Sequence, residues 1–246
     1  MSLLLNGGLI LGWGLSLALS LGSNSAQGPM WLLVMFILLR TQLQTGLFIV
    51  AHDAMHRLLW PGHVRLNDAL GALALMFYAA LPYQACCRQH QCHHNHPATA
   101  QDPDFPRSQS SDVLVWFSQF LARYLSPRQM TALLAAWGLL VLMTMAGARV
   151  TAPVAILRVL LFTTLPLLLS SLQLFFFGTY LPHRVQRHPE RNPHPISLNL
   201  PPWLSLLACY HFGYHREHHD NPTLSWYQLP AARARGLSLA LPERSW

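Results

Sequence analysis

Long apolar runs, rather than amphipathic or alternating patterns, dominate this chain. Residues 1–39 contain no Asp, Glu, Lys or Arg, and within this stretch Ser2–Leu21 is nearly all apolar. A second apolar run extends from Pro29 to Ala51, and the segments Gln129–Ala148 and Val159–Pro182 carry no formal charge. A helix needs about 20 apolar residues to cross a bilayer. The pattern therefore predicts four transmembrane helices.

Short polar or turn-forming segments separate these runs in pairs. Ser23–Gly28 joins the first two runs, and Arg149–Pro153 joins the last two. Connections this short bring consecutive helices side by side in opposite directions. We therefore expect two helical hairpins.

A fifth apolar segment, Ala69–Cys87, is not expected to be a simple span. Histidine clusters flank it at 52–56 and 90–96, and a full crossing would separate them by about 30 Å of hydrocarbon. Leu81-Pro82 near its end favours a broken or re-entrant segment. Val113–Leu125 alternates apolar and polar residues and is typical of an interfacial helix.

Composition supports the membrane interpretation. Hydrophobic residues make up 52% of the 246 residues and charged residues only 10%, against about 25% charged in a typical soluble domain. These values argue against a soluble fold and exclude intrinsic disorder, and the length suits a single domain over residues 1–246. The absence of a concentrated basic patch argues against nucleic-acid binding.

The arginines predict the orientation in the membrane. All 16 basic residues are Arg. If the turns 23–28 and 149–153 face outward, only Arg149 and Arg158 lie near the outer side, and Arg40 lies within a helix. The remaining arginines fall on the inner side, as the positive-inside rule requires. Every histidine then lies on or near the cytoplasmic side.

Three histidine motifs stand out among the 14 histidines. His52-Asp-Ala-Met-His56 has i, i+4 spacing, and the motifs His90-Gln-Cys-His93-His94 and His215-Arg-Glu-His218-His219 have i, i+3, i+4 spacing. On a helix these spacings place imidazoles on one face. Neutral imidazole binds Fe, Zn, Cu and Ni, and eight ligands exceed what one tetrahedral zinc holds. The motifs predict a site for two metal ions.

Three other histidines remain ambiguous from the residues alone. His183 ends the fourth apolar run and is either a ninth ligand or an ordinary interfacial residue. His211 is expected one helical turn before His215, on the same face, as a ligand, an outer hydrogen-bond partner or a structural residue. His96 is similarly open, and His63, His188 and His194 are interpreted as solvated loop residues.

Carboxylates adjoin the motifs. Metal-bound histidines usually donate their second ring N–H to an outer acceptor, and the candidates for that role are Asp53, Asp102, Asp104 and Glu217. Asp102 and Asp104 are equally interpretable as part of a proline turn. The spacing of Cys86, Cys87 and Cys92 fits no common cysteine metal site, so we expect small buried residues there.

At these motifs the chain resembles the bacterial β-carotene ketolases of the membrane fatty-acid desaturase and hydroxylase superfamily. The three histidine motifs are similar to those of the whole superfamily. Two further segments, Asp102-Pro-Asp-Phe105 and Phe177-Gly-Thr-Tyr-Leu-Pro-His-Arg184, also match. His-Asp-Ala-Met-His and Gly-Thr-Tyr-Leu-Pro-His-Arg are the combination that points to the ketolases. The likeness covers roughly Phe48 to Gly236 and is thin across residues 113–170.

The resemblance implies a fold, a cofactor and a reaction. The fold is a single membrane-embedded desaturase-like oxygenase domain, all-α, in a bacterial inner (plasma) membrane with its site on the cytoplasmic side. The cofactor is two non-haem irons with O₂ as co-substrate, and the resemblance raises His183 to a ninth ligand. The implied ligands are His52, His56, His90, His93, His94, His183, His215, His218 and His219.

The implied reaction is oxidation of C4 of a β-ionone ring of β-carotene, by two hydroxylations and loss of water, to an echinenone- or canthaxanthin-type ketone. No dinucleotide-binding or iron–sulfur motif is present, so a ferredoxin-type electron donor is implied. The alternatives are a carotenoid 3-hydroxylase, a fatty-acyl desaturase or hydroxylase and, outside these enzymes, a membrane metal carrier or a haem-binding cytochrome.

Overall fold

The computed structural model describes residues 2–22, 28–106, 112–184 and 195–236, and all of their regular structure is helical. Four helices are long and apolar enough to cross a membrane, as the sequence predicts. They are α1 (Ser2–Gly22), α2 (Met30–Met55), α6 (Pro127–Ala148) and a continuous helix over Ala152–His183. Large apolar side chains cover their outer faces; Leu4 is 82% exposed and Met30 71%. Exposed surface of this kind suits lipid rather than water.

The Ala152–His183 helix is α-helical with two π-helical interruptions. Its parts are α7 (Ala152–Val159), η2 (Leu160–Thr164), α8 (Leu165–Leu174), η3 (Phe175–Tyr180) and α9 (Leu181–His183). Each π segment ends two residues before a proline, Pro166 or Pro182. Proline lacks an N–H and its ring clashes with the carbonyl four residues earlier. The widened turns relieve that clash and keep the helix continuous as far as His183.

Arg40 shows how a charge is tolerated in the centre of α2. Its side chain is fully buried, and Nε donates to the carbonyl of Phe162 at 3.0 Å. Phe162 lies four residues before Pro166, so its carbonyl lacks the usual helical donor. Nη1 donates to the carbonyl of Trp13 and the hydroxyl of Ser16, both at 2.9 Å. Arg40 therefore fastens α1 and the interrupted helix to α2.

The segment between the first two histidine motifs is broken. It forms α3 (Val64–Ala79) and α4 (Tyr83–Asn95), whose axes differ by 99°. The break lies at Ala80–Pro82, where Ala80 takes a left-handed backbone conformation and Pro82 starts the next helix. This confirms the expected break at Leu81-Pro82.

Two glutamines from neighbouring helices complete the end of α3. Carbonyls at a helix C-terminus have no partner within the helix, and burying them unpaired is costly. Gln44 of α2 donates to the carbonyl of Tyr78 at 2.5 Å, and Gln129 of α6 donates to that of Ala79 at 2.6 Å. These amides allow α3 to end inside the molecule.

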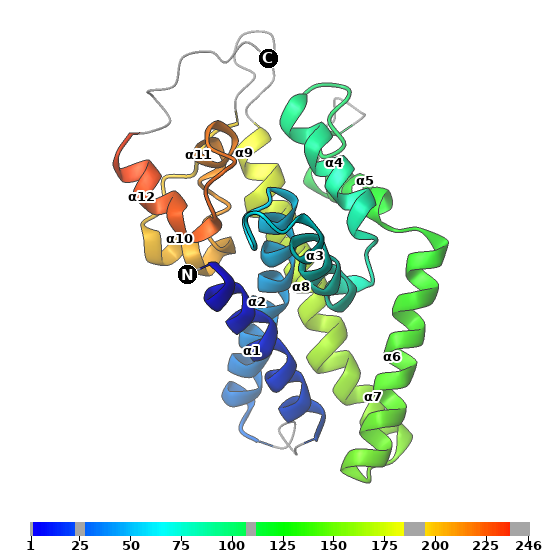
Figure 1. Ribbon diagram of the computed structural model, residues 1–246. Coiled ribbons are helices and arrows are strands. Elements are labelled where there is room, and N and C mark those ends of the chain that lie inside the picture. The colour runs from blue at the N-terminus through cyan, green and yellow to red at the C-terminus, as the bar shows by residue number, and fades with distance from the viewer. Residues whose placement is uncertain (1, 23–27, 107–111, 185–194, 237–246) are drawn as a thin grey trace.

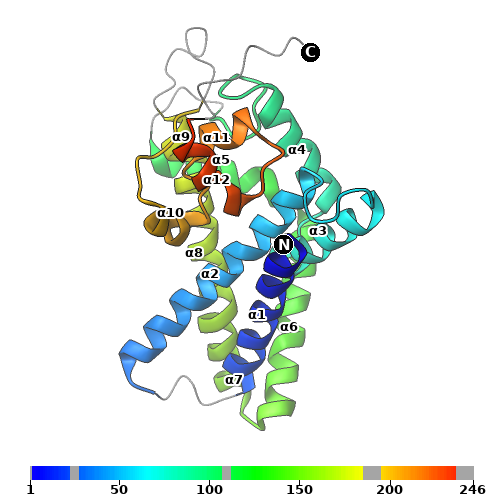
Figure 2. The ribbon, with the colours of Figure 1, turned by 60° about the vertical axis from the view of Figure 1, so that its left-hand side comes forward.

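The remaining helices are short and surround the histidine motifs. They are α5 (Val113–Tyr124), α10 (Pro202–Cys209), α11 (His215–Asp220), η4 (Trp226–Gln228) and α12 (Leu229–Ala234). Figures 1 and 2 show α4, α9 and α11 at the same end of the molecule, where α2 also ends. The bundle thus brings all the histidine motifs to one end.

Candidate metal centre

The nine histidines predicted as ligands gather into two groups. Within each group, the ligand nitrogens lie within 4.8 Å of one another. Group one contains His52, His56, His90, His94 and His218, and group two contains His93, His183, His215 and His219. Four helices supply them: α2, which carries His52 and is capped by His56, and α4, α9 and α11.

Each three-histidine motif divides its members between the groups. In α4, His90 and His94 face group one while His93 faces group two. In α11 the division is reversed, because His215 and His219 join group two and His218 joins group one. Residues four apart lie on the same helical face, whereas the third points about 60° to one side. Two helices with this spacing can therefore line two adjacent sites.

All nine rings present Nε2 to the interior of their group. In group one, the Nε2–Nε2 distances are 3.1 Å for His52–His218, 2.7 Å for His56–His90 and 2.9 Å for His94–His218. In group two they are 3.0–3.1 Å for the pairs His183–His215, His93–His219 and His215–His219. Rings from the two groups also touch: His94 and His219 stack with centroids 4.2 Å apart.

This donor set fits metal ions. Ligand nitrogens at about 2.1 Å from one ion lie roughly 3–4 Å apart, which matches these separations. The groups contain imidazole nitrogen alone among the described residues, and Cys86, Cys87 and Cys92 belong to neither. Imidazole suits Fe, Zn, Cu and Ni.

The electrostatics keep the rings ready to bind a cation. Burial lowers the pKa of His56 to about 4, and burial with neighbouring histidines holds the pKa of His218 and His219 well below 6.5. These three rings are therefore neutral at pH 7, as metal binding requires.

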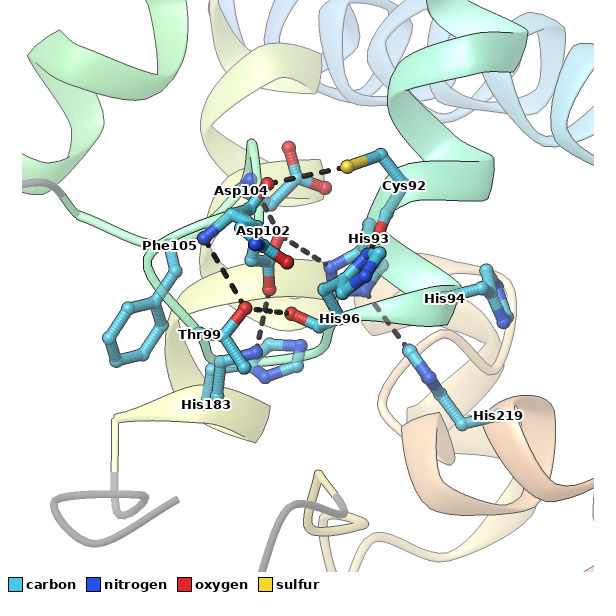
Figure 3. A network of polar contacts seen from close by, with 12 residues as sticks. Cys92, His93, His94, His96, Thr99, Asp102, Asp104, Phe105, His183 and His219 are labelled. Carbon is cyan, nitrogen blue, oxygen red and sulfur yellow. Dashed lines mark hydrogen bonds and ion pairs between the residues drawn. The ribbon is translucent and has the colours of Figure 1, made fainter. Parts of the chain in front are cut away.

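Asp102 orients His93. Its Oδ1 lies 2.9 Å from Nδ1 of His93, and Nε2 of His93 faces His219 (Figure 3). Burial alone lowers the pKa of His93, but the bond to Asp102 outweighs it and raises that pKa. Burial also opposes ionisation of Asp102, but His93 brings its pKa below the usual range. Asp102 is placed to fulfil the outer-acceptor role predicted for it.

The loop that carries Asp102 is fastened at both ends. Backbone N–H groups of Ala98 and Asp104 donate to Asp102 at 2.8 Å. Arg123 of α5 donates to the carbonyls of Asp102 and Phe105 at 3.1 and 2.9 Å. Helix α5 therefore holds this carboxylate in position.

The other three predicted carboxylates have different partners. Asp53 is hydrogen-bonded to Ser225 and to the backbone of Trp226. Glu217 pairs with Arg233 at 2.9 Å and accepts from the hydroxyl of Ser197. Asp104 accepts from the hydroxyl of Tyr124 at 3.1 Å. Glu217 therefore faces the C-terminal segment, whereas Oδ1 of Asp53 also lies 3.9 Å from Nδ1 of His52. The outer-acceptor role stays a prediction for both carboxylates.

The prediction that His211 shares a helical face with His215 is wrong. Helix α10 ends at Cys209, and Tyr210 and His211 both have positive φ, so no helix joins His211 to His215. The His211 ring instead stacks on Tyr214 with centroids 5.7 Å apart. His96 is exposed and caps α4, while His188 and His194 lie outside the described residues.

A cavity of about 250 Å³ opens onto both histidine groups. His52 and His90 of group one and His93 and His215 of group two line one part of it. The remaining wall is largely apolar and comes from α2, α3, α5, α6, α8 and the segment around Phe212, with lining residues that include Phe48, Leu81, Phe120, Leu133, Trp137, Leu167 and Leu174. The cavity therefore places a largely apolar space beside both histidine groups.

Sequence reasoning did not single out several polar residues of the cavity wall, among them Tyr124 and Gln129. In the sequence, Gln129 begins a predicted apolar span and Tyr124 lies in a predicted interfacial helix. A lone polar residue in an apolar helix needs a hydrogen-bond partner. That requirement could have indicated a buried role for Gln129.

Comparison with known proteins identifies the relationship. The fatty acid desaturase family model matches residues 28–246. The chain is 38% identical over 246 residues to the "Beta-carotene ketolase" of Paracoccus sp. (strain N81106 / MBIC 01143), covering 96% of this chain and 93% of the relative. It is 39% identical to the "Beta-carotene ketolase" of Paracoccus sp. (strain PC1), covering 80% and 77% of the two chains.

A third relative is the "Zeaxanthin 4-ketolase" of Chlamydomonas reinhardtii, which is 42% identical over 212 residues. That match covers 80% of this chain and 44% of the relative. The family model covers every histidine motif, and the two Paracoccus relatives cover most of the chain. The chain therefore belongs to the fatty acid desaturase family and, within it, to the β-carotene ketolases.

Proposed function

We propose that this protein is a carotenoid C4 ketolase that oxidises the β-ionone ring of β-carotene to a 4-keto product. The observation that carries the proposal is the apolar cavity that opens onto both histidine groups. Three relatives named as ketolases support the substrate class.

The proposed cofactor is a pair of non-haem irons, held by the five histidines of group one and the four of group two. When bound, the irons would activate O₂, because O₂ must be activated before it can attack an unreactive C–H bond. Burial keeps rings such as those of His218 and His219 neutral, Asp102 fixes His93, and the apolar cavity surrounds the reacting carbon. Exclusion of water there limits side reactions.

The stoichiometry follows from the change of a methylene to a ketone. In each of two rounds, one O₂, two electrons and two protons place one oxygen atom in a C–H bond of C4, and the other leaves as water. The first round gives the alcohol, and the second gives a geminal diol that loses water to leave the carbonyl. We propose that a reduced ferredoxin-type protein supplies the electrons.

The proposed substrate path lies within the membrane. The cavity wall includes Trp137 of α6 and Leu168 of α8, whose helices also present apolar surface outward. A carotenoid dissolved in lipid then reaches the metal centre without crossing water.

The proposed topology has two hairpins, α1–α2 and α6 with the Ala152–His183 helix, with α3–α4 re-entrant and α5 interfacial. The histidine end faces the cytoplasm of a bacterial inner membrane, and residues 1–246 form one domain. Three observations support this: the four candidate spans, the break between α3 and α4, and the arginine distribution.

Expression in a β-carotene-producing bacterium tests the function. We expect 4-keto carotenoids by chromatography and mass analysis, and iron near two per chain in freshly purified protein. A 3-alcohol as end product would indicate a 3-hydroxylase, and an unchanged carotenoid pool with altered lipid unsaturation would indicate a desaturase. An active protein that reproducibly holds a single zinc would contradict the di-iron proposal.

A further inference from the structure

The cavity beside the metal centre contains a carboxyl group that the ligand set leaves unused. Asp104 is the one acidic residue among the described residues that line the cavity, and His93 lines the same cavity. Burial raises the pKa of this carboxyl group. A polar group against hydrocarbon is costly without a partner. A cavity that only had to accommodate a hydrocarbon ring would be expected to lack it.

Asp104 is not needed to hold the histidines, because Asp102 already does so. Asp102 uses its oxygens on His93 and on the backbone N–H groups of Ala98 and Asp104. The side chain of Asp104 instead accepts from the hydroxyl of Tyr124, which also lines the cavity. Figure 3 shows the two aspartates side by side near His93.

The backbone of Asp104 is fixed from outside the cavity. The indole N–H of Trp116 donates to its carbonyl at 2.8 Å, and Arg123 holds the next carbonyl, that of Phe105. A carboxyl group has about four acceptor sites, and Tyr124 occupies one on Oδ1. The pair is therefore a preorganised acceptor at the metal end of an otherwise apolar space.

The proposed reaction supplies a matching donor. Before the first oxidation C4 is a ring methylene with two hydrogens, and after it C4 carries one hydrogen and a hydroxyl group. We propose that Asp104 and Tyr124 bind the hydroxyl group of the 4-hydroxy ring and retain it in the cavity for the second oxidation. This inference rests on the proposed function. It assigns the pair a positioning role that acts on the alcohol and not on β-carotene itself.

The retained alcohol then undergoes the second round as written above. O₂, two protons and two electrons from the ferredoxin-type donor convert the remaining C4–H bond to C4–OH, with one water formed. The diol loses a second water to give the ketone. A hydrogen bond to a charged or strongly polar group changes an equilibrium by roughly 10- to 100-fold. Its loss is expected to shift the competition between release and second oxidation by a similar factor.

The test compares products formed by Asp104→Val, Asp104→Asn and Tyr124→Phe in membranes supplied with β-carotene, O₂ and reduced ferredoxin. We expect the ratio of 4-hydroxy to 4-keto products to rise roughly 10-fold or more in Asp104→Val and by a smaller factor in the other two. Total β-carotene consumed and iron content should remain near those of the unaltered protein. With a 4-hydroxy carotenoid as the supplied substrate, kcat/KM should fall in the variants.

Asp112→Asn and Tyr227→Phe are matched controls outside the cavity. Asp112 caps α5, and asparagine caps helices equally well. If Asp104→Val does not accumulate in membranes, Asp104→Asn and Tyr124→Phe decide. An unchanged product ratio, or alcohol and ketone falling in parallel, overturns the inference while the ketolase function stands. An unaltered protein that forms no ketone contradicts the proposed function itself.

Discussion

The imidazole rings of this site face one another through their Nε2 atoms, so their arrangement depends on whether a proton or a cation lies between these nitrogens. Two neutral rings at 2.7–3.1 Å satisfy each other only when one nitrogen carries the proton. A bound cation satisfies all the nitrogens at once. The orientation of each ring then depends on its other nitrogen, and for His93 that partner is Asp102 at 2.9 Å.

Asp102→Asn is expected to weaken metal retention. The amide keeps the shape of the side chain but removes the charge that holds His93 with its proton on Nδ1. Loss of such an outer partner typically lowers metal affinity about 10- to 100-fold. Iron remaining after dialysis against graded chelator measures the effect, with Asp112→Asn as the control. Retention equal to that of the unaltered protein would contradict the role assigned to Asp102.

Acid is expected to destabilise the metal-free protein. An unfolded histidine titrates near pH 6.5, whereas burial lowers the pKa of His56 to about 4 in the folded state. Between these values the unfolded chain takes up protons that the folded chain excludes, so stability falls as the pH drops from 6.5 toward 4. His56 alone corresponds to about 2 kcal/mol at pH 5. Denaturation midpoints in detergent at pH 7.5 and pH 5 check this, and an equal or higher midpoint at pH 5 would oppose it.

At the scale of elements, the break between α3 and α4 positions two of the three histidine motifs relative to each other. Asn67 of α3 donates to the carbonyl of Ala54 in α2 at 2.7 Å and accepts from the N–H of Leu59. Gly71, one turn further along α3, packs against Ala54 of α2 and Tyr83 of α4. A β-carbon there would lie 2.6 Å from that of Ala54 and would also clash with the ring of Tyr83.

Gly71→Ala is therefore expected to separate α3 from its neighbours. Overpacking of this kind costs about 1–3 kcal/mol, so the thermal midpoint and the iron content should both fall. Gly138→Ala in α6 is the matched control, because nothing lies within 4 Å of its added β-carbon. If the two variants behave alike, the close approach of α3 is not essential.

At the scale of the whole molecule, one end of the bundle carries the chemistry and the rest is a lipid-facing support. The spans expose apolar side chains, while α4, α9 and α11 gather at the opposite end from the α6–α7 turn (Figures 1 and 2). The α3–α4 segment must return to the side from which it came if all three motifs share one site.

Labelling with an impermeant thiol reagent tests this topology. Single cysteines at exposed positions 63, 101 and 151 are introduced into a cysteine-free background. On intact cells we expect position 151 to react from outside and positions 63 and 101 to react only after lysis. External labelling at 101 with protection at 63 would show a fifth crossing and would contradict the re-entrant arrangement.

Local sequence patterns were enough to predict the helical class, the four spans and the eight histidines of the three motifs, and the family resemblance added His183. These depend on local properties: apolar run length, and the i, i+3, i+4 spacing that places rings together on a helix. The break at Leu81-Pro82 was also predictable, because proline interrupts a helix locally and the flanking histidine motifs can share one site only if the segment turns back. The sequence did not determine which ring joins which group, since His93 and His94 are adjacent in the chain yet face different groups.

Only the tertiary structure decided how the carboxylates are used. Asp53, Asp102, Asp104 and Glu217 have the same chemistry and all adjoin the motifs, but they have different partners in the folded chain. Those partners come from distant segments, as Arg233 does for Glu217 and Tyr124 for Asp104. The same holds for His211, where two positive φ angles interrupt an apparent helical repeat. Spacing along one helix fixes which side chains share a face, whereas packing between helices fixes what that face meets.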